Sequence, residues 1–258
     1  MKTFILIIIA IATIILLFLY FKGIYNKSLL IKEFNRCNVI VAGKQGTGKD
    51  ILFQTVIHAK KKEKAFTNID YGYNTEHVEI SQLSVAPNTY ENFINGNIKK
   101  IPRNEEMEGK DVYISDAGIH LPSQYDSKLH KQYPSFPIYY ALTRQLYDQH
   151  IHMNAQTFDR IWKVIREQGD YYIVCKRTIK LLGFIFIVRY ITYEKYESAK
   201  ANILPMKNRL FNKFSKAEQD QFNATNGEIK KRYIITYKWR IKYDTRAFKK
   251  VLFDLKDA

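Results

Sequence analysis

The residues best suited to chemistry lie in the stretch NVIVAGKQGTGKD, residues 38–50. Four apolar residues lead into a loop with the spacing G-x-x-x-x-G-K, and an apolar stretch of helical period follows it. Glycines at this spacing let successive backbone N–H groups point at phosphate oxygens, and the N-terminus of the following helix adds positive potential. The pattern therefore predicts a phosphate-binding loop between a strand and a helix. The predicted nucleotide-binding residues are Gly43, Lys44, Gln45, Gly46, Thr47, Gly48, Lys49 and Asp50.

The last position of this loop is unusual, because Asp50 stands where the pattern has Ser or Thr. The usual hydroxyl ligates Mg²⁺, and a carboxylate is also a good ligand for this ion. Asp50 is therefore a predicted metal ligand, although its charge beside the phosphates would weaken their binding. Lys49 is predicted to reach the outer phosphates of ATP. The alternative is a glycine- and lysine-rich turn at the start of a helix, but the strand before and the helix after favour the phosphate loop.

A second acid follows an apolar strand further along the chain. In DVYISDAG the strand 112–115 ends at Asp116, which is the layout of a Walker B element that delivers a carboxylate to Mg²⁺ or to its water. ATPases of this kind have a second acid directly afterwards, and here the neighbour is Ala117. In an alternative alignment Ser115 takes the place of the first acid and Asp116 that of the second. Asp116 is the predicted metal ligand and catalytic residue, although a lone acid at the end of a strand is also a common turn former.

Two more polar residues complete the candidate site. Gln156 follows the predicted strand 150–155, where such folds place a polar residue near the γ-phosphate; an amide that bonds the backbone at the end of a strand is the equal alternative. Arg144 lies on a predicted helix that begins near residue 135, away from the apolar side of that helix. His150 and His152 alternate on the strand with no third ligand nearby, so no metal site is predicted there.

Strand and helix patterns alternate from residue 39 to residue 165, which predicts an α/β fold with a mostly parallel sheet. After residue 170, aromatic and β-branched stretches predict an antiparallel pair, and the strict alternation from Tyr233 to Tyr243 predicts a half-buried strand with its basic side outward. Strands are expected at 39–42, 65–70, 112–115, 150–155, 171–174 and 181–193. Helices are expected at 51–64, around 90–94, from 135, at 158–165 and from 244 to 255.

The chain begins with an apolar run, residues 4–21, that carries no charge. It is long enough to cross a bilayer, which needs about 20 residues. A cleaved signal peptide is the alternative, but a signal has a shorter apolar region, a more basic start and a small-residue cleavage site, so an uncleaved anchor is favoured. One Lys precedes the run, and Lys22, Lys27, Lys32 and Arg36 follow it. This asymmetry predicts a single-pass protein of the cell membrane with its C-terminal body in the cytoplasm.

The composition is that of a folded protein with a basic C-terminal part. Of the net charge of +16, +12 lies in residues 171–258, which hold 20 Lys and Arg against 8 Asp and Glu. Such a field attracts DNA or an anionic membrane surface, or it serves solubility alone. The two cysteines, Cys37 and Cys175, form neither a disulfide framework nor a paired zinc motif, so reduced thiols are expected. The expected regions are a transmembrane anchor (1–22), a linker (23–37), a P-loop ATPase domain (38–175) and a smaller, basic, β-rich C-terminal region (176–258).

Several short motifs follow one another along residues 38–174. They are GKQGTGKD, FTNID, VYISDAG, the pair Thr143 and Arg144, the strand before Gln156, and FDR at Phe158 to Arg160. In this order they resemble the zonular occludens toxin-like proteins, a branch of P-loop ATPases that includes the filamentous-phage assembly protein. The resemblance implies an ATP-driven role in extruding phage particles, or in exporting phage DNA, at the host bacterial cell membrane.

The resemblance also implies roles for individual residues. Residues 43–49 would bind phosphate, Asp116 would serve Mg²⁺ or its water, Gln156 would sense the γ-phosphate, and Arg144 would reach into the site of the next subunit. The implied cofactors are ATP and Mg²⁺, and the implied partners are further copies of the chain, other phage assembly or secretion proteins, and DNA as an open alternative. The chain departs from the family at Asp50, at the missing second acid, and in having its anchor before the ATPase domain. Two other functions therefore stay open: a membrane scaffold that binds nucleotide without hydrolysis, and a plasmid or conjugative DNA translocase.

Overall fold

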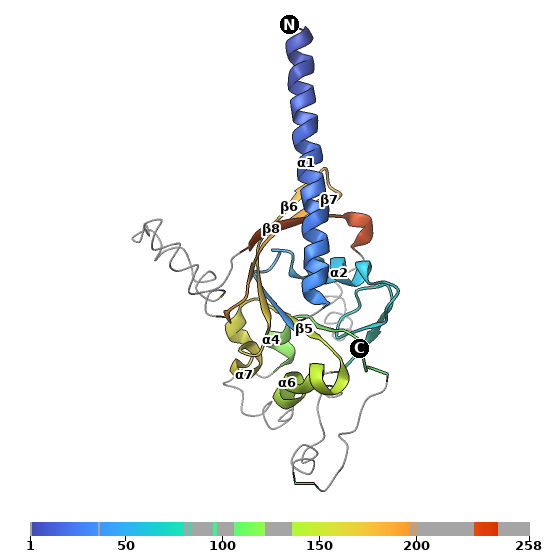
Figure 1. Ribbon diagram of the computed structural model, residues 1–258, viewed down its shortest axis with the longest axis vertical. Coiled ribbons are helices and arrows are strands. Elements are labelled where there is room, and N and C mark those ends of the chain that lie inside the picture. Colours follow the sequence, from blue (N-terminus) through green and yellow to red (C-terminus); the bar gives the residue numbers. More distant parts are fainter. Residues whose placement is uncertain are drawn as a thin grey trace, which may run out of the picture.

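The computed structural model describes residues 2–35, 37–79, 83, 95–96, 106–121, 136–196, 199 and 230–241. The helices expected around residues 90–94 and from residue 244 to 255 lie outside these residues, as does the end of the alternating stretch after residue 241. Within the described part, one sheet forms the centre of the molecule and helices cover it (Figure 1).

Eight strands of the described residues form this sheet, in the order β3-β2-β4-β5-β1-β6-β7-β8. From β3 to β6 the neighbours run parallel, and β7 and β8 continue the sheet antiparallel. The mostly parallel sheet and the antiparallel pair after residue 170 are therefore confirmed. The strands are β1 (Val39–Ala42), β2 (Ala65–Thr67), β3 (Thr75–His77), β4 (Val112–Ile114), β5 (Ile151–Ala155), β6 (Tyr171–Leu181), β7 (Ile185–Tyr193) and β8 (Lys230–Tyr237).

Strand β6 joins the predicted ATPase domain to the predicted C-terminal region. Its first residues pair in parallel with β1, and the strand pairs antiparallel with β7 along most of its length. The expected boundary between residues 175 and 176 thus falls inside one strand, and the described part of the C-terminal region extends the same sheet. The physical reason is that the strand-forming sequence runs through this boundary without a Gly, Pro or Asn that would end it.

The helices largely follow the apolar patterns, but the helix expected at residues 51–64 ends at Ala59, before the lysine-rich stretch, and a second expected helix is interrupted. The helix expected at residues 158–165 is broken, because Ile161 and Trp162 are extended between two short helical turns. Phe158, Ile161 and Ile165 are nevertheless buried in one core, so the spacing of the apolar residues indicated burial but not one continuous helix. The helices are α1 (Lys2–Phe34), α2 (Lys49–Ala59), α4 (Ala117–His120), α6 (Phe136–Tyr147) and α7 (Lys163–Arg166), with 3₁₀ turns η2 (Phe158–Arg160) and η4 (Lys238–Arg240).

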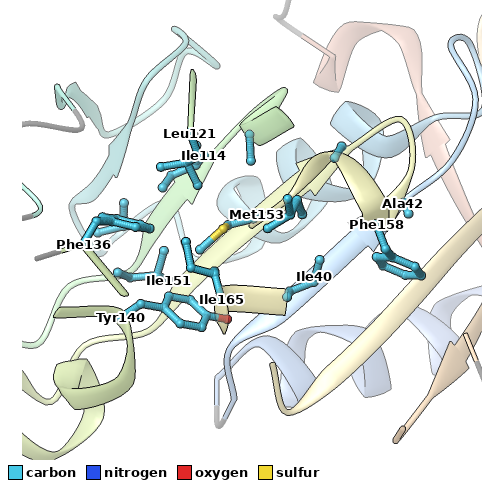
Figure 2. Packing of buried hydrophobic residues seen from close by; sticks show 14 of the residues in the cluster. Ile40, Ala42, Ile114, Leu121, Phe136, Tyr140, Ile151, Met153, Phe158 and Ile165 are labelled. Atoms are coloured by element: carbon cyan, nitrogen blue, oxygen red, sulfur yellow. The ribbon is translucent and has the colours of Figure 1, made fainter. Parts of the chain in front are cut away.

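Each face of the sheet has its own core, because alternate side chains of a strand point to opposite faces. On β1, Ile40 and Ala42 belong to one core and Val39 and Val41 to the other. The first core packs α4, α6 and α7 against the sheet, as Figure 2 shows around Met153. The second core packs α2 and the end of α1. The phosphate loop therefore starts from a strand that is buried on both sides.

Helix α1 has two different surroundings. The described large apolar side chains from Phe4 to Phe21 are exposed, and Figure 1 shows this half of the helix projecting from the body. Further along, Leu30 and Phe34 are completely buried in the second core. By length and composition α1 is able to cross a membrane. The segment expected as a linker, residues 23–37, is helical as far as Phe34, because one of its faces is apolar enough to join the core.

Strand β8 is buried on a different side from the one its alternation predicted. Ile234 and Thr236 are buried, whereas Tyr233 and Ile235 are half-buried beside α1. The regular strand ends at Tyr237, where η4 begins. The buried side is the one that joins the second core, in which Ile234 packs with Leu30 and Phe34 of α1, and the alternation along the strand could not show this.

Candidate nucleotide site

The predicted phosphate loop is formed as the sequence indicated, between β1 and α2. The backbone N–H of Gly43 donates to the carbonyl of Ala155 (3.3 Å), which ties the loop to the end of β5. The Thr47 hydroxyl donates to the carbonyl of Lys44 (2.7 Å) and closes the loop on itself. Lys49 is the first residue of α2, and only 6% of its surface is exposed. The loop thus lies at the carboxyl edge of the sheet, where α/β folds bind their ligands.

Two glycines of the loop are required by their surroundings. A Cβ atom on Gly43 would lie 2.6 Å from Thr47 Oγ1 and 2.8 Å from the carbonyl oxygen of Cys175. Gly48 has a φ of 97°, and a Cβ there would lie 2.4 Å from Thr178 Oγ1. The β6–β7 pair therefore forms the wall behind the loop. Burial raises the pKa of the Cys175 thiol, against the opposing charge of Lys49, which marks Cys175 as a packing residue.

Three side chains of the candidate site donate hydrogen bonds to the carboxylate of Asp50. Its Oδ1 atom accepts hydrogen bonds from the hydroxyl of Ser115 (2.6 Å), the hydroxyl of Tyr71 (3.0 Å) and the side-chain amide of Asn154 (3.0 Å). These donors come from the end of β4, from the loop after β2 and from β5. The carboxylate at the unusual position is therefore held by three separate parts of the sheet.

Ser115 contacts this carboxylate directly. Asn68 fixes the backbone of Ser115 on both sides, by accepting from its N–H (2.7 Å) and by donating to its carbonyl (2.9 Å). Asn154 donates to the Ser115 hydroxyl (3.2 Å) and accepts from the N–H of Asp116 (2.9 Å). Asp116 itself adopts a left-handed conformation with φ 46° at the start of α4. In the second alignment Ser115, which bonds Asp50, stands in the place of the first acid.

The structure gives fewer contacts for the two other predicted site residues, Gln156 and Arg144. Gln156 is half-buried and directly follows Ala155, whose carbonyl bonds the phosphate loop, so it lies at the same edge of the sheet. Arg144 lies within α6, which packs on the opposite face of the sheet from α1, and its side chain is outside the described part. The roles expected for these two residues stay predictions.

The donor set at Asp50 fits a magnesium ion. Among the residues that the structure describes, no group of three or more His, Cys, Asp and Glu side chains forms a metal cage. Mg²⁺ at a phosphate site needs no such cage, because one or two carboxylates, the substrate phosphates and water complete its shell. The Asp50 carboxylate and the Ser115 hydroxyl are both oxygen donors and adjoin the residue, Lys49, that begins α2. These residues would hold the ion beside a bound nucleotide.

A second titratable group lies at the other end of the strands. Asp111, just before β4, forms an ion pair with Lys60, and its Oδ1 atom lies 3.5 Å from Nδ1 of His150. Burial by itself would raise the pKa of Asp111, but the hydrogen bond from His150 and the Lys60 ammonium outweigh it and hold this pKa well below its usual range. Burial lowers the pKa of His152 to about 3, so its ring is neutral, and it packs on Phe34 of α1 at 4.6 Å. This group joins α1 to the sheet.

Sequence reasoning did not identify three residues of the site: Tyr71, Asn154 and Thr178. Asn154 carries the clearest signal, since it is a polar residue inside an apolar strand and is completely buried. Tyr71 directly follows the stretch FTNID, and nothing in the sequence links it to the loop. Thr178 lies behind Gly48 only because β6 pairs with the strand that starts the loop.

A glycine loop between the buried strand of a mostly parallel sheet and a helix defines the class of the protein as a P-loop NTPase. Its structure is similar to the N-terminal domain of zonular occludens toxin from Neisseria meningitidis, with a TM-score of 0.42 and 13% identity over 70% of this chain and 96% of that domain. It is also similar to the genome packaging NTPase B204 of Sulfolobus turreted icosahedral virus 2, with a TM-score of 0.39 and 14% identity over 78% of this chain and 98% of that one. The similarities concern the fold alone. No protein-family model and no curated protein matches the sequence.

Proposed function

We propose that the chain is a membrane-anchored P-loop ATPase that energises phage assembly and extrusion, or export of phage DNA, at the host cell membrane. The observation that carries the proposal is the position of Asp50, which lies directly after a formed phosphate loop and contacts residues at the ends of two parallel strands. The end of α1 packs in the same core as α2, the helix that carries Asp50. A nucleotide site and a helix able to cross a membrane thus belong to one packed unit.

The residues of the loop support nucleotide binding. The N-terminus of α2 adds positive potential where the phosphates would lie. In the proposal Lys49 contacts the outer phosphates and Gln156 the γ-phosphate. Bound Mg²⁺ would neutralise charge on the β- and γ-phosphates, and Asp50 would hold it. Asp116 lies one residue beyond Ser115 and serves the ion or the attacking water.

The finer part of the proposal concerns the membrane and the partners. α1 crosses the membrane once, and the basic residues after its apolar run keep the body in the cytoplasm, where ATP is present. Copies of the chain form a ring in which Arg144 completes the site of the neighbouring subunit. Other assembly or secretion proteins dock on the ring, and the basic C-terminal part contacts DNA or lipid. These assignments follow the order of the sequence motifs and the charge distribution.

The test is Mg²⁺-dependent ATP turnover by the full chain in detergent micelles or nanodiscs. Lys49→Ala is expected to lower turnover about 100-fold or more, because a buried cation at the phosphates is lost. Lys62→Ala, which removes an exposed cation just after α2, is the control and is expected to leave turnover unchanged. Equal turnover in the wild type and Lys49→Ala would refute the proposal.

Two further measurements separate the alternatives. Tight nucleotide binding without turnover in the wild type would favour a scaffold that uses the nucleotide for structure. Turnover that rises with added DNA, with binding that weakens steeply as salt increases, would favour a DNA translocase.

A further inference from the structure

The carboxylate and the hydroxyl of the candidate metal site have exchanged elements. In the usual P-loop arrangement the first residue after the lysine supplies a hydroxyl to Mg²⁺, and the strand that holds the Walker B acid supplies a carboxylate. Here the helix supplies Asp50 and the strand end supplies Ser115, and the two side chains contact each other at 2.6 Å. We propose that this is a reciprocal exchange: Asp50 is the carboxylate ligand of Mg²⁺, and Ser115 is the hydroxyl that accompanies it. The inference rests on the proposed nucleotide binding and specifies its metal site.

The exchange removes an apparent conflict in the sequence. Asp50 alone would be an extra negative charge beside the phosphates, and it would weaken their binding. Because Ser115 is neutral where the usual acid would lie, the pair of positions still holds one carboxylate and one hydroxyl. The charge that faces the ion is therefore unchanged, and only the element that carries it differs.

The hydrogen bonds leave one oxygen of Asp50 for the ion. Every hydrogen bond that Asp50 accepts from the described residues ends on Oδ1, and its donors are a tyrosine, a serine and an asparagine. All three donors are neutral, so they orient the carboxylate without cancelling its charge. The second oxygen is then the one that a cation would take.

The exchange also changes the expected role of Asp116. With Ser115 in the position of the first acid, Asp116 occupies the position of the second, which acts on the attacking water and not on the ion. The N–H of Asp116 is held by Asn154, which also holds Asp50 and Ser115. One amide thus sets the spacing of all three residues.

A double-variant experiment tests the exchange. The full chain in detergent is titrated with a fluorescent ATP analogue in Mg²⁺ and in EDTA, and Mn²⁺ binding with ATP is measured by electron paramagnetic resonance. We expect Asp50→Asn and Asp50→Ser each to lower the metal-dependent part of the affinity about tenfold or more. Ser115→Asp places two carboxylates beside the phosphates and is expected to weaken nucleotide binding in EDTA, because like charges repel. Combining Asp50→Ser with Ser115→Asp rebuilds the usual arrangement and is expected to restore the metal-dependent part of the affinity.

The controls keep the outcomes distinct. Asp50→Asn keeps an oxygen for its three donors, and unfolding curves are expected to show that it folds. Asp70→Asn removes an exposed acid that lies outside this network and is expected to change nothing. The exchange is overturned if Asp116→Asn, and not Asp50→Asn, removes the metal dependence, or if the double variant binds no better than Asp50→Ser. A wild type that binds no nucleotide in either buffer would overturn the proposed function itself.

A second surface lies where α1 leaves the body, and it carries an independent inference. Leu182 and Trp239 are 80% and 64% exposed. The ring of Trp239 stacks on Tyr237 at 4.5 Å and on Phe184 at 6.1 Å. We call Leu182, Phe184 and Trp239 the apolar cap. Exposed apolar clusters of this kind mark contact surfaces.

The apolar cap adjoins the exposed half of α1. The Tyr233 hydroxyl donates to the carbonyl of Leu19 (2.8 Å), so β8 runs beside the last exposed turns of the helix. The cation of Arg240 lies over the ring of Tyr237 at 5.5 Å. Trp and Tyr beside Lys and Arg, at the end of an apolar span, are the composition of a membrane interface. We infer that the apolar cap lies in the interfacial layer of the bilayer that α1 crosses.

Tryptophan fluorescence tests this contact, because the chain has two Trp residues. The full chain is placed in bilayers with brominated lipids, with Trp162→Phe to observe Trp239 and Trp239→Phe to observe Trp162, which packs against the first core. The fluorescence of Trp239 is expected to fall at least about twofold more than that of Trp162, since the brominated chains lie within a few ångströms of an interfacial ring. A third variant carries Trp162→Phe, Trp239→Phe and Phe18→Trp. Its single Trp then lies in the apolar run of α1 and reports whether this run is inserted in the bilayer. Quenching of this reporter without quenching of Trp239 would overturn the inference, and no quenching of either would overturn the anchor as well.

Discussion

The two halves of α1 form one continuous helix but meet different surroundings. From Phe4 to Phe21 the described large apolar side chains are exposed all round. From Gly23 onward one side of the helix packs on the sheet through Gly23, Asn26, Leu30 and Phe34. These residues recur every three or four positions, which is the spacing of one helix face. The first half is thus apolar in composition, whereas the second half is apolar on one side.

The difference shows why the second half was expected as a linker. Residues 23–34 include several polar side chains, and two of them make specific contacts: Asn26 donates to the carbonyl of Tyr233 (3.0 Å), and Glu33 pairs with Arg232 (2.5 Å). These polar groups dilute the apolar signal along the sequence. In the structure they bind β8, so α1 is joined directly to the sheet edge. Movement of the body relative to a bilayer would therefore be transmitted to the sheet without a flexible joint.

The largest expected effect comes from the most deeply packed residue of the second half. Phe34 is completely buried and packs against the rings of His152 (4.6 Å) and Phe53 (6.0 Å). Phe34→Ala is expected to lower the free energy of unfolding by about 3–5 kcal/mol, measured by denaturant titration of the full chain in detergent. Phe18→Ala, in the exposed half, is the matched control and is expected to change it by less than about 0.5 kcal/mol. Equal losses in both variants would show that the two halves do not differ.

A smaller loss of stability is expected when the pH is lowered, because the ring of His152, which packs on Phe34, must then take up a proton. Burial lowers the pKa of His152 to about 3, whereas an unfolded chain has a His pKa near 6.5. Between these values the unfolded state binds the proton and the folded state does not. As far as His152 is concerned, the free energy of unfolding is therefore highest well above pH 6.5. It falls as the pH falls, by about 2 kcal/mol at pH 5.

Unfolding curves from pH 7 to pH 5 measure this dependence. His152→Phe is expected to remove most of the slope, whereas His77→Gln, which changes an exposed histidine, is expected to leave it. The range stops above pH 4.5 because the low pKa of Asp111 adds a loss of the same sign at lower pH. An unchanged slope in His152→Phe would show that another group takes up the proton.

Local chemistry in the sequence predicted the centre of this fold, and contacts between distant segments supplied the rest. The β1, loop and α2 sequence followed from glycine spacing, since the conformation depends on neighbours in the chain. The partners of Asp50 could not be predicted in this way, because Ser115 and Asn154 reach it only after β4 and β5 have paired with the rest of the sheet. The alternation in β8 predicted a strand but not its buried side, which α1 decides from more than 200 residues away.

The smallest expected effect concerns Gly23, where α1 crosses from its exposed half to its packed half. A Cβ at this position would lie 3.0 Å from Ile235 Cδ1 and 3.4 Å from Tyr233 Cε2. Gly23→Leu is expected to destabilise the chain by about 1 kcal/mol, at the low end for overpacking, since the tip of a flexible side chain gives way. Ile235→Ala in the same chain makes room and is expected to recover most of the loss. Ala10→Leu places a side chain of the same final size in the exposed half and is expected to be neutral in detergent unfolding. A loss with Ala10→Leu, or no recovery with Ile235→Ala, would place the start of the packed half elsewhere on the helix.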